Sequence, residues 1–358
     1  MNLTDIVLRY RHRLEQRHGA RMLPGHHRAL DAIVACRTPA CGQVVFDCPE
    51  CHRMEQRPCS CGHRMCPVCR NFETTRWLGR QTAKLLPVRY YMVTLTLPGV
   101  LRPLAWCHQR QVYSDMFAAA VEAMRDLAGG RYGFGADIAM TGVLHTHARN
   151  RDYHPHIHFI VPGGGIDRRN HAWKKRTGRW LFPAKALSKL FRGKLADRLQ
   201  DAGLRVSPRI YDHDLVAKII TVGTGEPALK YLARYLYRGV IAESAILSDS
   251  HGQVTFEYRK SKTDERRTRT MPGEDFLWLL LRHVLPKGFQ RVRSYGFLHH
   301  RARRTFLLVQ YVLRVAAALA EPATRPVFHC PRCNAPMVAV AFIPPLNGSS
   351  EARSPPPR

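Results

Sequence analysis

The sequence lacks an apolar run long enough to cross a lipid bilayer. Its best candidate, LLVQYVLRVAAALA, is interrupted by Arg314, whereas a spanning helix needs about 20 consecutive apolar residues. The opening stretch, MNLTDIVLRYRHRLEQRHGAR, carries charges where a secretory signal peptide would be apolar. These absences predict a cytoplasmic protein with no membrane partner, in a compartment where disulfide bonds are uncommon.

Acidic residues are also scarce. The 358 residues include 27 Asp and Glu against 56 Lys and Arg, which gives a formal net charge of +29. This excess predicts a polyanionic partner, and because the arginines are spread over the chain instead of forming a tail, we favour nucleic acid. A basic proteome or binding to a membrane surface would also explain the charge. With 45% hydrophobic residues, the chain is long enough for two or three globular domains.

Cysteines are abundant for a chain without disulfides, and eight of the 11 lie between Cys36 and Cys69. The two C-x-x-C pairs in CPEC and CPVC have the spacing of zinc ligands, so the simplest arrangement is one structural zinc ion held by Cys48, Cys51, Cys66 and Cys69. A second site has its candidate ligands in Cys36, Cys41, Cys59 and either Cys61 or His63. Free thiols or a redox pair are the alternative.

A third C-x-x-C pair, Cys330 and Cys333, stands far downstream in HCPRC. It would either form a separate zinc knuckle with His329 or complete a site with cysteines from the N-terminal region. The sequence leaves both arrangements open.

The hydrophobic pattern predicts an α+β fold, with a mainly antiparallel sheet and flanking helices. Strands are expected over 89–98, 137–147, 156–161 and 215–222, and helices over 108–128, 185–201 and 227–238. The predicted domains are a zinc-binding module (1–85), a catalytic domain (86–245) with a basic insertion (163–182), a mostly helical region (246–322), the CPRC segment (323–342) and a disordered tail (343–358).

Histidines gather where two predicted strands would form a hairpin. Because side chains two positions apart share a face of a strand, His156 and His158 project together, and the hairpin brings His145 beside His156. Three imidazoles would then converge on one divalent cation, with positions left open for water or phosphate. His147 and His154 are reserve ligands, and the alternative is a set of partly exposed surface histidines.

The stretch GEPALKYLARYLYRG (225–239) predicts an amphipathic helix with two tyrosines on its outer face. Its apolar stripe consists of Leu229, Leu232, Ala233 and Leu236. Tyr231 and Tyr235 lie roughly opposite that stripe, one turn apart, on the face shared with Arg234 and Arg238. Such tyrosines suit nucleophilic attack on a DNA phosphate. The cation would polarise that phosphate, and the arginines would offset the negative charge that develops on it. A surface on which bases stack is the alternative.

Two further segments are candidate DNA contacts, the first because it mixes cations with an aromatic ring, although a solvated basic face is equally consistent with both. The first contains Arg168, Arg169, Trp173, Lys174, Lys175 and Arg176, and the second is HHRARR (299–304). The zinc module is a third candidate.

Together these motifs resemble the HUH endonucleases, named for their His–hydrophobic–His motif, here His156–Ile157–His158. More narrowly, the chain resembles a two-tyrosine rolling-circle transposase of the insertion sequence 91 family. The resemblance extends through the cysteine cluster, TLTLPGVLR, LHTHARNRDYHPHIHFIVPGGG, ALKYLARYLYRGVI, RHVLPKGFQRVRSYGFL and CPRC. His145, eleven residues ahead of His156, resembles the first histidine of three-histidine relaxases.

The resemblance implies an HUH nuclease core that uses Mg²⁺ or Mn²⁺, a zinc-binding module, and Tyr231 and Tyr235 as nucleophiles. It implies a 5′-phosphotyrosine intermediate, single-stranded DNA at the element ends, a target DNA, the host replication machinery as a partner, a nucleoid location and no need for ATP. Two alternatives stay open. One is a plasmid replication initiator or relaxase with the same chemistry, and the other is a zinc-dependent DNA-binding repressor without catalysis.

Overall fold

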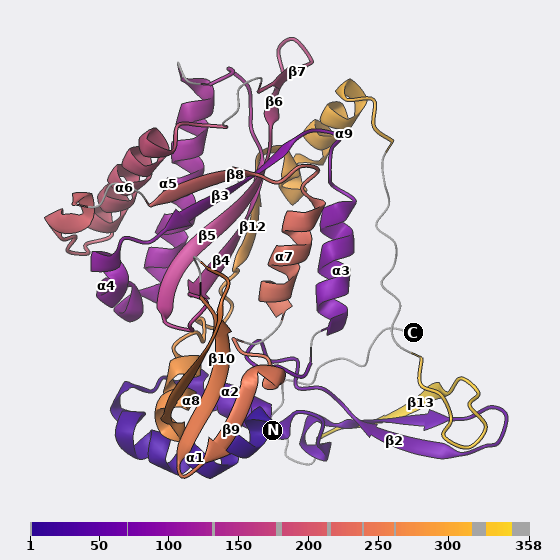
Figure 1. Cartoon of the computed structure of the whole chain (residues 1–358). Helices are drawn as coiled ribbons and strands as arrows, with labels where there is room; N and C mark the ends of the chain where they lie inside the picture. The colour runs from indigo at the N-terminus through magenta and orange to yellow at the C-terminus, as the bar shows by residue number, and fades with distance from the viewer. Residues whose placement is uncertain are drawn as a thin grey trace. The chain divides into compact units, whose positions relative to one another are not determined.

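The computed structural model of the chain (Figure 1) describes residues 2–69, 71–130, 133–176, 181–212, 216–237, 240–260, 263–316 and 327–345. Four helical side chains are also outside the description, namely those of Asn71, Arg234, Tyr235 and Tyr237. Several predictions therefore fall wholly or partly outside the described residues, among them Arg238, residues 177–180 of the basic insertion, residues 317–322 of the helical region, residues 323–326 of the CPRC segment and the disordered tail from residue 346 onwards.

The chain forms two compact units, and neither is continuous in sequence. One consists of Met1–Glu73, Tyr237–Val284 and Ala323–Arg358, and the other of Thr74–Leu236 and Leu285–Pro322. We call them the zinc unit and the sheet unit, after their main features. This division corrects the prediction of consecutive domains, because segments of the zinc unit and of the sheet unit alternate along the chain.

The sheet unit is built on five antiparallel strands in the order β12-β4-β5-β3-β8. Their bounds are β3 Tyr90–Thr96, β4 Met140–His147, β5 Tyr153–Pro162, β8 Ala217–Thr221 and β12 Val292–Tyr295. The predicted α+β class with a mainly antiparallel sheet is confirmed. The predicted hairpin is present as well, since β4 pairs with β5 over almost its whole length.

Strand alternation gives this sheet two different faces. One face carries apolar side chains such as Val93, Leu95 and Phe159, which are fully buried against helices α5 Gln109–Gly129 and α6 Ala184–Asp201. Figure 1 shows α5 and α6 on one side of the sheet and α7 on the other. Because neighbouring residues point to opposite faces, the histidines of β5 project toward the α7 side.

Tight packing within the sheet explains a glycine in β4. A Cβ atom at Gly142 would come within 2.5 Å of the Phe159 ring and 3.0 Å of the Phe117 ring. The absence of a side chain at this position lets the two rings pack edge to face, with 6.0 Å between their centroids. The apolar face is therefore closely packed beneath the strands that carry the histidines.

The remaining elements of the sheet unit surround this core. They are α3 Asn71–Thr82, α4 Arg102–Cys107, the hairpin of β6 Gly164–Asp167 and β7 Ala172–Lys175, α7 Glu226–Tyr237 and α9 Arg303–Val312. The predicted basic insertion thus contains a two-stranded hairpin. Its Ile166 lies in a small apolar cluster with Phe297 and Val309.

In the residues that the structure describes, the zinc unit contains two antiparallel sheets and three α-helices. The first sheet has the order β13-β1-β2, with bounds β1 Gln43–Asp47, β2 Met54–Pro58 and β13 Val338–Ile343. The second is a meander of β9 Ile246–Ser250, β10 Gln253–Arg259 and β11 Arg266–Pro272. The helices are α1 Leu3–His18, α2 Pro24–Ala35 and α8 Gly273–Leu281.

The expectation of a mostly helical region over 246–322 is wrong, because residues 246–272 form the β9–β11 meander. Val254 and Phe256, two positions apart, are fully buried, while their neighbours are partly exposed. This alternation is typical of a strand with one face in the core. That core also contains Ile6, Leu30 and Phe276, one from each of the three helices.

In the part of the chain that the structure describes, no helix combines the length and the apolar character that crossing a membrane requires.

Candidate active site and zinc clusters

Three histidines meet on the α7 side of the five-stranded sheet. Register pairs His145 of β4 directly with His156 of β5, and His158 follows two positions along β5 on the same face. The ring centroids of His145 lie 5.2 Å from His156 and 4.6 Å from His158, and those of His156 and His158 lie 4.8 Å apart. One nitrogen of each ring lies within 4.8 Å of the others. We call these residues the histidine cluster.

Neighbouring groups orient two of these rings. Nδ1 of His156 donates to the carbonyl oxygen of His154, at 2.7 Å, and in the neutral ring this bond leaves Nε2 of His156 unprotonated and available to a cation. Nδ1 of His158 lies 2.8 Å from the hydroxyl oxygen of Thr94, on the neighbouring strand β3. When Nδ1 of His158 donates to that hydroxyl, its Nε2 also becomes available to a cation.

Burial keeps the histidine cluster neutral. Desolvation lowers the pKa of His156 to about 4, and desolvation together with the nearby His156 lowers the pKa of His158 to about 3. The pKa of His145 also falls well below its usual range, again because the ring is buried and then because of the other histidines. Neutral imidazole is the form that binds a metal. The cluster therefore fits a divalent cation with three nitrogen ligands and open positions.

The two reserve histidines lie outside this cluster. Nδ1 of His154 lies 2.8 Å from a guanidinium nitrogen of Arg102. A shift in register after His145 pairs His147 with Tyr153, whereas the register of the preceding pairs would place it opposite His154. Among the described residues, the group that could share one cation here contains His145 and neither reserve.

Helix α7 brings one tyrosine to the histidine cluster. Its apolar stripe is buried as the sequence predicts, with Leu229, Leu232 and Leu236 at most 4% exposed. The Tyr231 ring stands at 89° to the His158 ring, with 6.0 Å between centroids. Tyr235 follows one helical turn later on the same helix, and its side chain and that of Arg234 are outside the described part.

Two of the candidate basic residues of the β6–β7 hairpin, Arg168 and Lys174, form ion pairs within the protein. Arg168 forms an ion pair with Asp137 at 2.6 Å, and Lys174 one with Asp167 at 2.9 Å. Trp173 is partly buried and packs its ring edge to face with Phe297, at 6.0 Å, at the border of a local apolar cluster. Among the other candidates here, Arg169 and Lys175 are exposed. Arg176 is half-buried.

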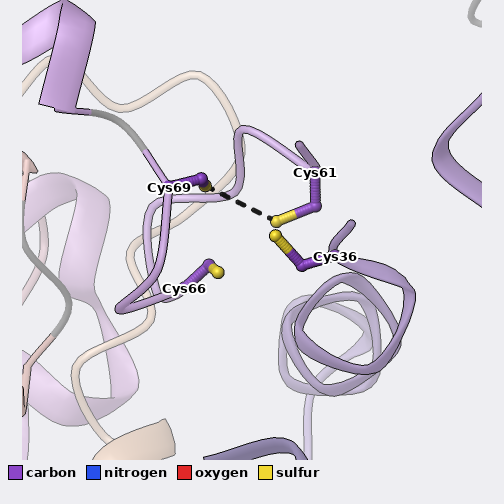
Figure 2. Close-up of side chains that lie close together, drawn as sticks. All are labelled: Cys36, Cys61, Cys66 and Cys69. Atoms are coloured by element: carbon purple, nitrogen blue, oxygen red, sulfur yellow. Dashed lines mark hydrogen bonds between the residues drawn. The ribbon is translucent and has the colours of Figure 1, made fainter. Parts of the chain in front are cut away.

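The cysteines form two clusters of four, both in the zinc unit. Figure 2 shows the thiols of the first thiol cluster, Cys36, Cys61, Cys66 and Cys69, pointing toward one another. The second thiol cluster consists of Cys48, Cys51, Cys330 and Cys333. In each, all four sulfur atoms lie within 4.8 Å of one another, and zinc bound by four thiolates at about 2.3 Å requires sulfurs about 3.8 Å apart. The Sγ atoms of Cys61 and Cys69 are 3.8 Å apart, so the donor set fits zinc.

The predicted pairing of these cysteines is wrong. The two N-terminal C-x-x-C pairs do not share a zinc site, since each meets a different partner pair. Cys41 and Cys59 belong to neither cluster, and Cys41 donates through its thiol to the Ala35 carbonyl at 3.0 Å. His63 is also outside the clusters. Spacing identifies which cysteines form a half-site, but it carries no information on which half-sites the fold brings together.

Comparisons with known proteins match the histidine cluster and the first thiol cluster to two different family models. A family model described as "Putative transposase" matches residues 139–305, which include the histidine cluster and α7, and one described as "Transposase zinc-binding domain" matches residues 6–97. No solved structure matches the chain.

Two curated relatives match most of their length. A putative transposase of Sinorhizobium fredii is 31% identical over 324 residues, which cover 84% of this chain and 81% of that protein. The transposase for insertion sequence element IS801 of Pseudomonas savastanoi pv. phaseolicola is 26% identical over 351 residues, which cover 87% of this chain and 82% of that protein.

These matches and the fold define a transposase with a zinc-binding domain, a DNA-processing enzyme. The chain belongs to the insertion sequence 91 family of transposases. The resemblance in the sequence to this family is confirmed.

Proposed function

We propose that this transposase nicks single-stranded DNA at the ends of its element through a tyrosine nucleophile and carries out rolling-circle strand transfer. The observation that carries the proposal is the position of Tyr231 beside the histidine cluster. Its ring lies 6.0 Å from that of His158, whose own ring is 4.8 Å or less from both other members. A nucleophile and a candidate cation site at this separation can act on one phosphate.

In the proposed step, the Tyr231 oxygen attacks the phosphorus of the scissile phosphodiester. The new bond joins phosphorus to the tyrosyl oxygen, and the bond from phosphorus to the 3′ oxygen of the preceding nucleotide breaks. The tyrosyl proton passes to solvent, and the departing 3′ oxygen takes up a proton to become a free hydroxyl. Because one phosphodiester replaces another, the 5′-phosphotyrosine link keeps the bond energy for a later transfer and no ATP is required.

The neutral imidazoles of the histidine cluster would hold Mg²⁺ or Mn²⁺, and that ion, when bound, would polarise the non-bridging oxygens of the phosphate. The chain's own contribution is to fix these ligands on two paired strands and to keep them unprotonated by burial. The Thr94 hydroxyl and the His154 carbonyl help to orient the rings.

Tyr235 is proposed as the second nucleophile, which acts while the first tyrosine still holds its strand. Its position four residues after Tyr231 is consistent with this role, since both residues then lie on the same side of α7. The free 3′-hydroxyl would serve the host replication machinery as a primer. The remaining proposed DNA contacts are the cations of α7 and of the β6–β7 hairpin, and the zinc module as the reader of the element's end.

A covalent-trapping assay tests the proposal. Purified protein would be incubated with end-labelled single strands from both element ends and Mg²⁺ or Mn²⁺, then resolved on denaturing gels. We expect a metal-dependent protein–DNA adduct that Tyr231→Phe weakens, that the double variant with Tyr235→Phe abolishes, and that His156→Ala also removes. Tyr211→Phe is a matched control, because Tyr211 is 54% exposed in the same unit but belongs to the short 3-10 helix Pro208–Tyr211 instead of to α7.

Tight DNA binding without any adduct on either end would refute the nuclease proposal and favour a DNA-binding repressor. An adduct confined to a plasmid origin would favour a replication initiator.

A further inference from the structure

The second thiol cluster joins segments from opposite ends of the chain. Cys48 directly follows strand β1, and Cys330 and Cys333 precede strand β13. Register pairs Asp47, the last residue of β1, with Val338, the first residue of β13. Because the strands are antiparallel, the loop that leaves β1 and the loop that enters β13 lie at the same end of the sheet. The topology therefore brings the two C-x-x-C pairs face to face.

The two loops have the same backbone hydrogen bonds. In each, the N–H of the first cysteine donates to the carbonyl five residues later: Cys48 to Arg53 at 3.1 Å and Cys330 to Ala335 at 2.8 Å. The residue four positions after the first cysteine donates back to the carbonyl of that cysteine, at 2.8 Å in both loops, and it has a positive φ, 56° and 59°. These two residues are His52 and Asn334. Two C-P-x-C sequences 282 positions apart thus form the same tight turn.

The sulfur atoms have the spacing of a tetrahedral zinc site. Sγ of Cys48 lies 3.5 Å from Sγ of Cys333, and Sγ of Cys51 lies 3.5 Å from that of Cys330 and 3.7 Å from that of Cys333. A zinc ion with four thiolates at about 2.3 Å has sulfurs about 3.8 Å apart. The backbone N–H of Arg332 approaches Sγ of Cys330 at 3.4 Å, which favours a thiolate at that position.

Within the described residues, the apolar core beside this sheet is small. The apolar cluster at this end consists of the buried residues Cys48, Cys330 and Met337, with a few partly buried neighbours. Every residue of β13 is exposed, and so are four of the five residues of β2. A three-stranded sheet with so small a core needs a metal ion or covalent links to be stable in water.

We propose that Cys48, Cys51, Cys330 and Cys333 bind a second zinc ion that fastens the C-terminal strand β13 to the N-terminal zinc-binding domain. This site is distinct from the first thiol cluster, whose four cysteines all lie between residues 36 and 69. Cys330 and Cys333 are outside the residues matched by the zinc-binding family model, 6–97. The proposal does not depend on the nuclease mechanism. It requires the protein to contain two structural zinc ions per chain, one for each thiol cluster.

Alkylation of the wild-type protein tests the proposal without a variant that could misfold. Cys333 and Cys107 are both exposed, and Cys107 belongs to neither cluster. The purified zinc-loaded protein would be treated with iodoacetamide, and the modified cysteines would be located by mass spectrometry of peptides. We expect Cys107 to react at least tenfold faster than Cys333, and we expect a chelator to remove this difference. Equal rates in the zinc-loaded protein would overturn the proposal.

Zinc content provides the second measurement. The double variant Cys330→Ser with Cys333→Ser should lose one of the two zinc ions, as measured by atomic emission, and segment 338–343 should gain rapid hydrogen exchange. The variants Cys41→Ser and Cys59→Ser are matched controls from outside both clusters and should keep both ions. A double variant that retains the full zinc content would exclude these residues as ligands. If the variant loses both ions through misfolding, the alkylation of the wild type decides.

Discussion

The hydroxyl of Thr94 should set the metal affinity of the histidine cluster without touching the metal or the DNA. It lies 2.8 Å from Nδ1 of His158, and the His158 side chain is 8% exposed, so water has little access to replace it. Thr94→Val keeps the shape and the strand preference of the side chain but leaves a buried imidazole N–H without this acceptor. Such a group costs about 1–3 kcal/mol, and loss of a hydrogen bond that orients a metal ligand lowers metal affinity by roughly 10–100-fold.

The assay is nicking of a labelled element end across a titration of Mn²⁺. Thr94→Val should raise the Mn²⁺ concentration for half-maximal rate by about 10–100-fold, and a large excess of Mn²⁺ should restore most of the maximal rate. Thr141→Val is the matched control, because the Thr141 hydroxyl lies in the same sheet on a buried side chain but bonds Ser294 at 3.0 Å instead of a histidine. If both variants have the metal dependence of the wild type, or if excess Mn²⁺ does not rescue Thr94→Val, the reasoning about His158 is refuted.

Two further predictions follow from the histidine cluster. His145→Ala should reduce adduct formation by at least about 100-fold, because it removes one of three ligands, whereas His147→Ala should change it by less than about tenfold; similar losses in both would contradict the choice of His145. The second prediction concerns the chelated protein. The pKa of His156 is lowered to about 4 and that of His158 to about 3, so the unfolded state binds protons first as the pH falls below about 6.5. The free energy of unfolding should therefore decrease by about 1.4 kcal/mol per pH unit for each of these histidines between pH 6.5 and 4, and remain flat above pH 7. Urea unfolding at several pH values measures the slope, and a slope that is unchanged in His156→Gln would contradict this assignment.

The sequence predicts the centre of the sheet unit well because its signals there are local. The alternation of His156, Ile157 and His158 shows directly which side chains share a face, and the short loop before them makes a hairpin with the preceding strand the simplest connection. The helical stripe of α7 shows in the same way that Tyr231 is not part of the buried face. Local periodicity is sufficient to bring these residues near one another once the two strands are paired.

Long-range pairings are not visible in such patterns. The half-site Cys48–Cys51 finds its partner at Cys330–Cys333, because β13 pairs with β1 across almost the whole chain, and no spacing rule indicates this pairing. The β9–β11 meander is hard to recognise in the sequence, because its alternation of buried and exposed residues is confined to a short stretch around Val254 and Phe256 and no residue of β11 is buried. Its core partners, the helices at the start of the chain, lie more than 200 residues away in sequence.

The central claim is that Tyr231 and the histidine cluster form one catalytic centre, and locating the covalent bond tests it most directly. The adduct trapped on an element end with Mn²⁺ would be digested with protease and nuclease, and the modified peptide would be sequenced by tandem mass spectrometry. We expect a 5′-phosphate of the nicked strand linked to Tyr231, a link that moves to Tyr235 in Tyr231→Phe and is absent in His158→Ala. A nucleotide attached to any residue outside α7, or an adduct that forms equally well without the histidines, would contradict the account.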